Sequence, residues 1–433
     1  HEAPSVTSSQ ADADVDTPDK PRRSRLNFGA ALADVIGFWA GSSFFDPRSI
    51  LQEFMTHLTK SNVVIGLMTS VVSSSISLTQ VLVANYVERL PIKKWYVVGV
   101  ASVERILLLV LAVLTPFLAV KHPKAMIGVL FVLLAMHYLS MGCSMPAYSA
   151  LISKIVPPRR RGLLYGLGGT LANVVTMGTG LAIPFILRSK ASWGGFPNGF
   201  AVCFGVGFLI LTASFLPLAF VDEPRDTIPA HRHTMMQFFA QLWDILRTRR
   251  DFQLFIVATS LSVFGAAGTA FHMTYAIREL GAPTGESGWF TVLMSLGALA
   301  SFFWGVLADR TDNRTVLKLA SLLVAGASAY SIFAPSLYWF YPVVFVTSVG
   351  MRGLDLAGYT IQMEFGPPAE VPRYVALTFG AQYIPRLVAP VAAGLLADSL
   401  GFRTVFVYAT LSSFLAFVSI LFMRDPRDAR STP

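Results

Sequence analysis

The feature that most constrains this chain is a series of apolar runs, each as long as a bilayer is thick. A hydrocarbon core about 30 Å thick takes about 20 apolar residues per helix. Only 14% of the residues are charged, whereas soluble domains carry about 25%. This composition excludes an ordinary soluble fold. The predicted spans are residues 28–57, 62–86, 95–119, 125–152, 162–187, 200–221, 252–278, 286–308, 314–334, 338–363, 373–397 and 404–423.

Helices account for these runs better than a membrane barrel does. A backbone in lipid must satisfy its own hydrogen bonds, and barrel strands would show about ten alternating residues each, a pattern that is missing here. The longest polar segment between spans separates two sets of six, as in the internal repeats of secondary transporters. We therefore predict an all-α integral membrane protein with twelve transmembrane helices in two pseudo-symmetric six-helix bundles.

The segments outside the spans are polar and carry their own signals. The N-terminal tail is rich in Ser, Asp and Pro, which is typical of disorder. Apolar residues recur at helical spacing within the central linker, which predicts an amphipathic helix at the membrane surface. The predicted order is a disordered tail (1–25), an N-terminal bundle (26–221), the linker (222–251), a C-terminal bundle (252–423) and a second tail (424–433).

The distribution of Lys and Arg predicts the orientation in the membrane. Most of the 34 basic residues fall in segments that share one side with both termini. We therefore expect a multi-pass protein of the cytoplasmic membrane with both termini and the linker in the cytoplasm. The net charge of +9 follows from this bias and predicts no nucleic-acid partner. The basic residues expected on the outer side are Lys60, Lys121, Lys124, Arg188, Lys190, Arg278 and Arg403.

A loop motif in the second half indicates the class of protein. GVLADRTDNR, residues 305–314, resembles the signature G-x-L-A-D-R-x-G-x-R/K of the major facilitator superfamily, with Asp312 in place of the second Gly. In that family the Gly permits close packing, and the Asp and Arg pair across a cytoplasmic helix junction. The resemblance thus implies a conformational latch. The matching residues are Gly305, Leu307, Ala308, Asp309, Arg310 and Arg314.

Two further stretches extend the resemblance over nearly the whole chain. The equivalent first-half loop, residues 83–94, lacks the glycines but keeps Glu88 and Arg89 at latch positions. Residues 389–406 resemble the family's pattern of a Pro, small residues and a Gly-aromatic-Arg turn before the last helix. The resemblance implies the major facilitator fold, transport by alternating access of two halves, and a central cavity lined by spans one, four, seven and ten.

Charged residues inside spans are the strongest site candidates, because each is expensive in lipid unless it meets partners or water. Arg352 and Asp355 lie near the centre of the tenth span and share a helix face at i, i+3 spacing. Arg386 lies in the eleventh span between Pro385 and Pro390. We predict that these charges bind the substrate or the coupling ion. An internal ion pair or an inter-helix pairing that only joins helices is the alternative.

The stretch FFDPRSI, residues 44–50, places two charges in the outer half of the first span. Pro47 should loosen its turn. Asp46 and Arg48 stand two apart, so on a helix they would point to nearly opposite faces and would not pair. Arg48 would share a face with Asp34 instead. We predict that Asp46 or Arg48 faces the outward half of the cavity; the alternative is that both snorkel into the headgroups.

The remaining polar residues in the spans suggest no catalysis. His137 and His272 are candidates for solute binding or proton relay near neutral pH. Glu104 and Arg105, in the third span, favour a structural role. The histidines have no partner at metal-ligand spacing, and no nucleophile or phosphate-binding motif occurs, so we expect no enzyme activity, no metal and no cofactor.

These observations predict a monomeric secondary transporter that moves a small organic solute across the membrane. Central arginines outnumber central carboxylates, which favours an anionic or zwitterionic solute. Carboxylates and histidines within spans favour proton coupling. Two alternatives stay open: a proton-driven exporter of amphipathic compounds, and a membrane assembly or delivery factor of the same fold that transports nothing.

Overall fold

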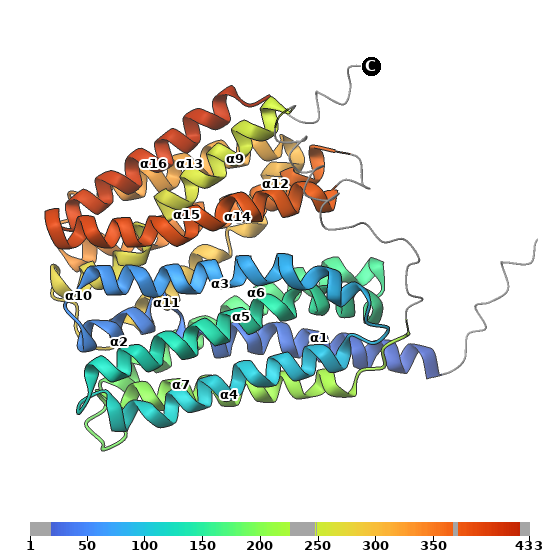
Figure 1. Ribbon diagram of the computed structural model, residues 1–433, viewed down its shortest axis with the longest axis horizontal. Coiled ribbons are helices and arrows are strands. Elements are labelled where there is room, and N and C mark those ends of the chain that lie inside the picture. The colour runs from blue at the N-terminus through green and yellow to red at the C-terminus, as the bar shows by residue number, and fades with distance from the viewer. Residues whose placement is uncertain (1–18, 226–246, 248, 367–370, 425–433) are drawn as a thin grey trace, which may run out of the picture.

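The computed structural model describes residues 19–225, 247, 249–366 and 371–424, and within them the regular secondary structure is helical throughout. Figure 1 shows the helices of the first half, blue to green, in one bundle and those of the second half, yellow to red, in another beside it. The two bundles come together at the end where α2 (Ile50–Leu58) and α10 (His272–Arg278) lie. The start of the first helix and the end of the last lie at the opposite end of the molecule.

The first bundle contains six spans, of which the first is interrupted. It runs α1 (Asp19–Ser42), the 3-10 turn η1 (Ser43–Phe45), α2, α3 (Asn62–Glu88), α4 (Lys94–Leu118), α5 (Pro123–Ile155), α6 (Pro158–Leu187), α7 (Asn198–Phe215) and η2 (Leu216–Phe220).

The second bundle repeats this plan, with breaks in its first two spans. It runs α9 (Arg250–Ala266), η3 (Thr269–Phe271), α10, α11 (Glu286–Ala298), α12 (Ser301–Arg310), α13 (Asn313–Ser331), α14 (Leu337–Ile361), η4 (Gln362–Glu364), α15 (Val371–Leu400) and α16 (Phe402–Phe422).

Hydropathy agrees with a membrane location for these helices. Ten stretches of the described residues are long and apolar enough to cross a membrane. The two remaining long helices, α13 and α14, pack against each other, and each also packs against one of those stretches, α16 and α11 respectively. They complete the second set of six. The expected all-α, twelve-span class is therefore confirmed.

Close helix packing repeats between the two halves. In the first bundle, added Cβ atoms at Gly37 and Gly41 of α1 would overlap α7, that at Gly41 approaching Leu211 to 2.7 Å. In the second bundle, Gly265 of α9 and Gly268, two residues after this helix, lie in the same way against α16. Small residues let helix backbones approach in lipid, where the hydrophobic effect does not drive helices together. The first and sixth spans of each half therefore pack by the same device.

The first span departs from its predicted form at both ends. α1 begins at Asp19, so residues 19–25, expected in the disordered tail, are helical. Arg and Lys are good helix formers, which lets the span extend backward into this basic stretch. Pro47 does more than loosen a turn, because the helix stops at η1, Asp46 is extended and a new helix starts at Ile50. The predicted amphipathic linker helix lies outside the described residues.

Candidate functional site

The two bundles are joined by hydrogen bonds at the end formed by α2 and α10, which we call the gate. There α3 packs along α15, and α6 packs along α11. Arg278 of α10 donates to the carbonyls of Thr59 and Lys60, each at 2.9 Å, and to the side-chain oxygen of Asn62 at 2.6 Å. All three acceptors belong to the first bundle. The gate is closed in this structure.

Two adjoining cavities lie between the bundles. The first, of about 130 Å³, is lined by α1, η1 and the loop after it, together with α6, η3, α10, α11 and α14. The second, of about 390 Å³, shares Arg48, Met351 and Asp355 with the first and reaches Tyr359, Leu317 and Ile420 toward the opposite end of the molecule. Spans one, seven and ten line this space as the resemblance implied. Span four does not, since no residue of α5, which is described throughout, lines either cavity.

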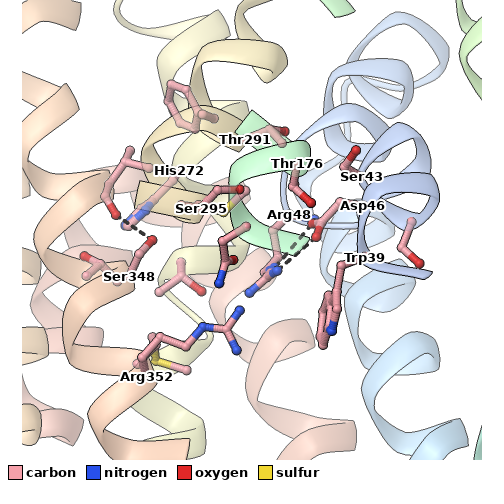
Figure 2. Close-up of a pocket in the computed structure, with 18 of the residues that line it drawn as sticks. Trp39, Ser43, Asp46, Arg48, Thr176, His272, Thr291, Ser295, Ser348 and Arg352 are labelled. Atoms are coloured by element: carbon pink, nitrogen blue, oxygen red, sulfur yellow. Dashed lines mark hydrogen bonds and ion pairs between the residues drawn. The ribbon is translucent and has the colours of Figure 1, made fainter. Parts of the chain in front are cut away.

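Asp46 and Arg48 line the first cavity and pair with each other. The carboxylate of Asp46 accepts from the backbone N–H of Arg48 at 2.7 Å and forms an ion pair with its guanidinium at 2.9 Å. The prediction that they do not pair was wrong, because residues 46–49 are not helical and the 100° step per residue does not apply. An Asx-type turn takes its place. Figure 2 shows both side chains at the cavity, with the pair drawn as dashed lines.

Arg352 and Asp355 also line the first cavity, on the opposite wall formed by α14. They are separated by 4.0 Å, and the side chain of Asp355 is 65% exposed, so their ion pair is loose. The guanidinium of Arg352 lies 5.8 Å from the ring centroid of Trp39, across the bundle boundary. In Figure 2 the guanidinium groups of Arg48 and Arg352 point toward one another in the cavity. Two arginines therefore lie close together beside the ring of Trp39, and the charge of Arg352 is only partly balanced, by Asp355 at 4.0 Å.

Arg386 lines the second cavity. One of its terminal nitrogens donates to Gln382 at 2.9 Å, on the same helix, and its backbone carbonyl accepts from Ser73 of α3 at 3.2 Å. Its buried Nε has no hydrogen-bond partner among the described residues. The buried hydroxyls of Thr176 and Thr347, in the first cavity, are likewise unpartnered within the described chain. Unsatisfied polar atoms around a cavity are suited to bind a polar solute.

Of the two candidate histidines, only His272 lines a cavity. His272 lines the first cavity and packs edge-on against Phe340, with ring centroids 5.3 Å apart. His137 is buried away from both cavities, where its Nδ1 lies 3.1 Å from the backbone oxygen of Glu104 and its ring contacts Phe45. This structure does not bring His137 to either cavity, and its role in solute binding or proton relay stays a prediction. Its helix, α5, turns it toward the interior of its own bundle.

Asp34 likewise lies outside both cavities. It is buried within the first bundle and lies near Arg105, outside both cavities. Arg105 is 3.7 Å from Glu104, donates to the carbonyl of Leu211 at 3.2 Å and lies over the ring of Phe215. This cluster of charges joins helices of one bundle, so the structural interpretation of Glu104 and Arg105 agrees with the geometry. The candidate role of Asp34 in binding the substrate or coupling ion stays a prediction, and this structure places the residue outside both cavities.

Asp309 and Arg310 do not form the latch pair that the resemblance implied. Asp309 and Arg310 are exposed, and neither has an ion-pair partner among the described residues. A Cβ added to Gly305 would meet open space, so the expected close packing is absent in this state. Arg314 instead donates to the carbonyls of Ile420 and Leu421 within its own bundle, at 3.1 and 2.8 Å. The side chain of Glu88 lies outside the described part of the structure, and Arg89 is exposed.

Sequence reasoning missed the charged residues of the gate. Glu53 of α2 and Asp398 of α15 both accept backbone hydrogen bonds from the opposite bundle. The same rule that selected Asp46, a carboxylate in a long apolar run, applies to Glu53. Glu53 lies within the predicted first span, residues 28–57, but nothing in the sequence shows which groups of the opposite bundle it meets.

The whole chain is similar to one protein family. The model of the Major Facilitator Superfamily matches residues 28–276 and 254–433. The structure of the nucleoside transporter NupG aligns with a TM-score of 0.68 at 11% identity, covering 93% of this chain and 99% of that one.

Two curated relatives match over shorter stretches. The niacin transporter NiaP of Acinetobacter baylyi is 28% identical over 152 residues, which is 35% of each chain. The purine ribonucleoside efflux pump NepI of Escherichia coli O127:H6 is 27% identical over 162 residues, 34% of this chain and 38% of the relative. The matched stretches therefore span little more than a third of these relatives.

Proposed function

The chain belongs to the Major Facilitator Superfamily, a family of membrane transporters and not of enzymes, and we propose that it carries a small organic anion or zwitterion by alternating access. Both termini lie in the cytoplasm in this proposal, as the basic residues predict. The closed gate then faces outward, and the cavity belongs to an inward-facing state. The exposed Asp309 and Arg310, which form no ion pair within the described residues, agree with that state.

The charge of the cavity is the observation that carries this proposal. Three arginines, Arg48, Arg352 and Arg386, line it against two aspartates, Asp46 and Asp355. Asp46 is already held by Arg48, whereas Arg352 has only a partner at 4.0 Å. A carboxylate of the solute would accept two hydrogen bonds from the guanidinium of Arg352 in bidentate geometry. Trp39 beside it offers a face on which a planar solute stacks.

A matched pair of solutes that differ only in charge tests this proposal. NiaP is named as a niacin transporter, so nicotinate and its neutral amide, nicotinamide, are suitable probes. Purified protein should bind nicotinate by calorimetry, and proteoliposomes should accumulate it, with nicotinamide a poor competitor. Equal competition by nicotinate and nicotinamide would contradict an anion site at Arg352. If neither binds, a panel of other carboxylates and zwitterions with their amides repeats the comparison.

Proton coupling forms part of the proposal. The exposed carboxylate of Asp355 lines the cavity together with the imidazole of His272, and both are groups that exchange protons. An inward-directed pH gradient imposed on proteoliposomes should then drive solute uptake above equilibrium. Asp355→Asn should retain exchange of labelled solute across the membrane but lose accumulation. Accumulation that is unaffected by a protonophore would contradict coupling to protons.

Export of amphipathic compounds is the second candidate, and the wider cavity favours it. Beyond Asp355 the walls are formed largely by apolar side chains such as Phe255, Val263 and Leu354. NepI, one of the relatives, is named as an efflux pump. A broad set of unrelated amphipathic compounds should then compete with one another for transport. Competition restricted to carboxylates would exclude the exporter.

A further inference from the structure

A buried carboxylate closes the gate by capping a helix of the opposite bundle. Glu53 is 1% exposed, on α2 of the first bundle. One of its oxygens accepts from the backbone N–H of Gly285 at 2.5 Å, and the other accepts from Ser287 at 3.1 Å. These N–H groups stand at the start of α11, in the second bundle. The first N–H groups of a helix have no partner within it, and they favour a negative charge.

The second bundle caps a helix of the first bundle in the same way. Asp398, at the end of α15, accepts from the backbone N–H groups of Asn62 at 2.9 Å and Val63 at 3.1 Å, at the start of α3. It also accepts from the hydroxyl of Ser61 at 3.0 Å. Helices α3 and α11 are the second spans of their respective halves. Each bundle therefore supplies one carboxylate that caps the second span of the other.

The two caps differ in their access to water. Asp398 is exposed, so solvent screens its charge whether the gate is closed or open. Glu53 is buried near Cys203 and the start of α11. A buried ionised carboxylate is stable only where donors satisfy it. The closed gate supplies those donors, and separation of the bundles removes them.

No cation among the described residues forms an ion pair with Glu53. The neighbouring Glu286 forms an ion pair with Arg188 at 3.4 Å and accepts a hydrogen bond from the hydroxyl of Tyr341 at 2.7 Å. On its own helix, the ring of His57 stacks on Phe196. Arg278 binds carbonyls and the side chain of Asn62 nearby. The charge of Glu53 is therefore balanced by backbone N–H groups and opposed by Glu286.

We propose that Glu53 is a proton-binding site that controls the gate. Ionised, it accepts both N–H groups of α11 and holds the gate closed. When a proton binds, an O–H bond forms on one oxygen, and that oxygen no longer accepts strongly from its N–H group. Protonation at the outer surface thus favours the outward-open state. This inference rests on the proposed alternating access and orientation, but not on the identity of the solute.

Distance measurements between spin labels test the proposal without any solute. The labels replace Lys121 of the first bundle and Arg403 of the second, both exposed at the gate end, in a chain with Cys143→Ala. In the otherwise unchanged protein, lowering the pH from about 8 to about 5, toward the range in which protein carboxylates titrate, should increase the population with a long distance. A distance distribution that does not change with pH would overturn the proposal.

Three variants assign the pH response to a residue. Glu53→Gln should raise the open population about tenfold, the effect of losing one charge-assisted hydrogen bond, and should abolish its pH dependence. Asp398→Asn should also open the gate but keep the pH dependence. Glu223→Gln is the matched control, because Glu223 caps the backbone of Lys93 and Lys94 within one bundle. It should leave the distances unchanged.

These outcomes distinguish a failure of the gate role of Glu53 from a failure of alternating access. A pH response that persists in Glu53→Gln, or disappears in Asp398→Asn, would refute the role of Glu53 and leave alternating access standing. If no open population appears in any variant at any pH, both alternating access and the gate proposal fail. Size-exclusion profiles and thermal unfolding of each variant show whether it is folded.

Discussion

Gly66 and Gly288 stand near the starts of the second span of each half, and each faces the opposite bundle across the gate. A Cβ added to Gly66 would overlap the carbonyl of Pro390, and one added to Gly288 would overlap the carbonyl of Gly180 and the ring of Pro184. These obstacles are backbone and ring atoms, which cannot rotate away. Gly66→Ala and Gly288→Ala should therefore oppose closure of the gate.

The magnitude follows from the cost of overpacking. Extra methyl groups in a close-packed contact cost about 1 to 3 kcal/mol, and 1.4 kcal/mol is a factor of ten, so the ratio of closed to open protein should fall by about fivefold to about a hundredfold. The cost applies only to the closed gate, because the same positions face open space once the bundles separate. Each variant should thus favour the outward-open state and slow transport, while expression and folding stay close to those of the unchanged protein.

The spin-label pair at Lys121 and Arg403 measures the shift, and uptake into proteoliposomes measures its consequence. Gly205→Ala is the matched control, since a Cβ at Gly205 of α7 meets nothing within 4 Å. It should behave like the unchanged protein in both assays. If Gly66→Ala and Gly288→Ala keep the original distances and the original flux, the gate does not depend on the close approach of these backbones, and the reasoning is refuted.

Three further predictions concern single sites. Arg352→Ala should abolish binding of an anionic solute, measured by calorimetry, with unfolding temperature near that of the unchanged protein; retained affinity would remove Arg352 from the site. Arg105→Ala should destabilise the fold by about 3 kcal/mol, because Glu104 is left buried without its partner. The unfolding temperature in detergent should fall, while solute affinity per folded molecule should stay the same. A cysteine at Lys190 should react with an impermeant thiol reagent added outside intact cells and one at Arg310 should not, and the reverse pattern would invert the topology.

The depth of residues in the membrane was readable from the sequence because hydropathy reports it directly. An apolar run of about 20 residues shows which part of the chain crosses the membrane, and a charge inside it signals a partner or water. This reasoning placed Asp46, Arg48, Arg352, Asp355, Arg386 and His272 inside spans, and the structure brings all six to the cavities.

The direction in which a side chain points could not be read in the same way. Asp34 and His137 also lie within predicted spans, yet both are buried inside the first bundle and line neither cavity. Twelve helices offer many packing partners, and hydropathy is nearly uniform around a buried span, so it does not reveal which face meets the cavity. The break at residues 43–49 added a second error, since the helical face relation between Asp34 and Arg48 ends there.

The sequence by itself determined the membrane class, the division into two halves and the central charges, because lipid imposes length and polarity on every span independently of its neighbours. The tertiary structure alone decided the pairing of Asp46 with Arg48, the exposure of Asp309 and Arg310 and the closure of the gate. Closure of the gate depends on contacts between segments more than 200 positions apart, such as Glu53 with Gly285 and Asn62 with Asp398, whereas the pair of Asp46 and Arg48 depends on the break of the first span at residues 43–49. Only packing of the two bundles creates such contacts, and their reversal is what alternating access would require.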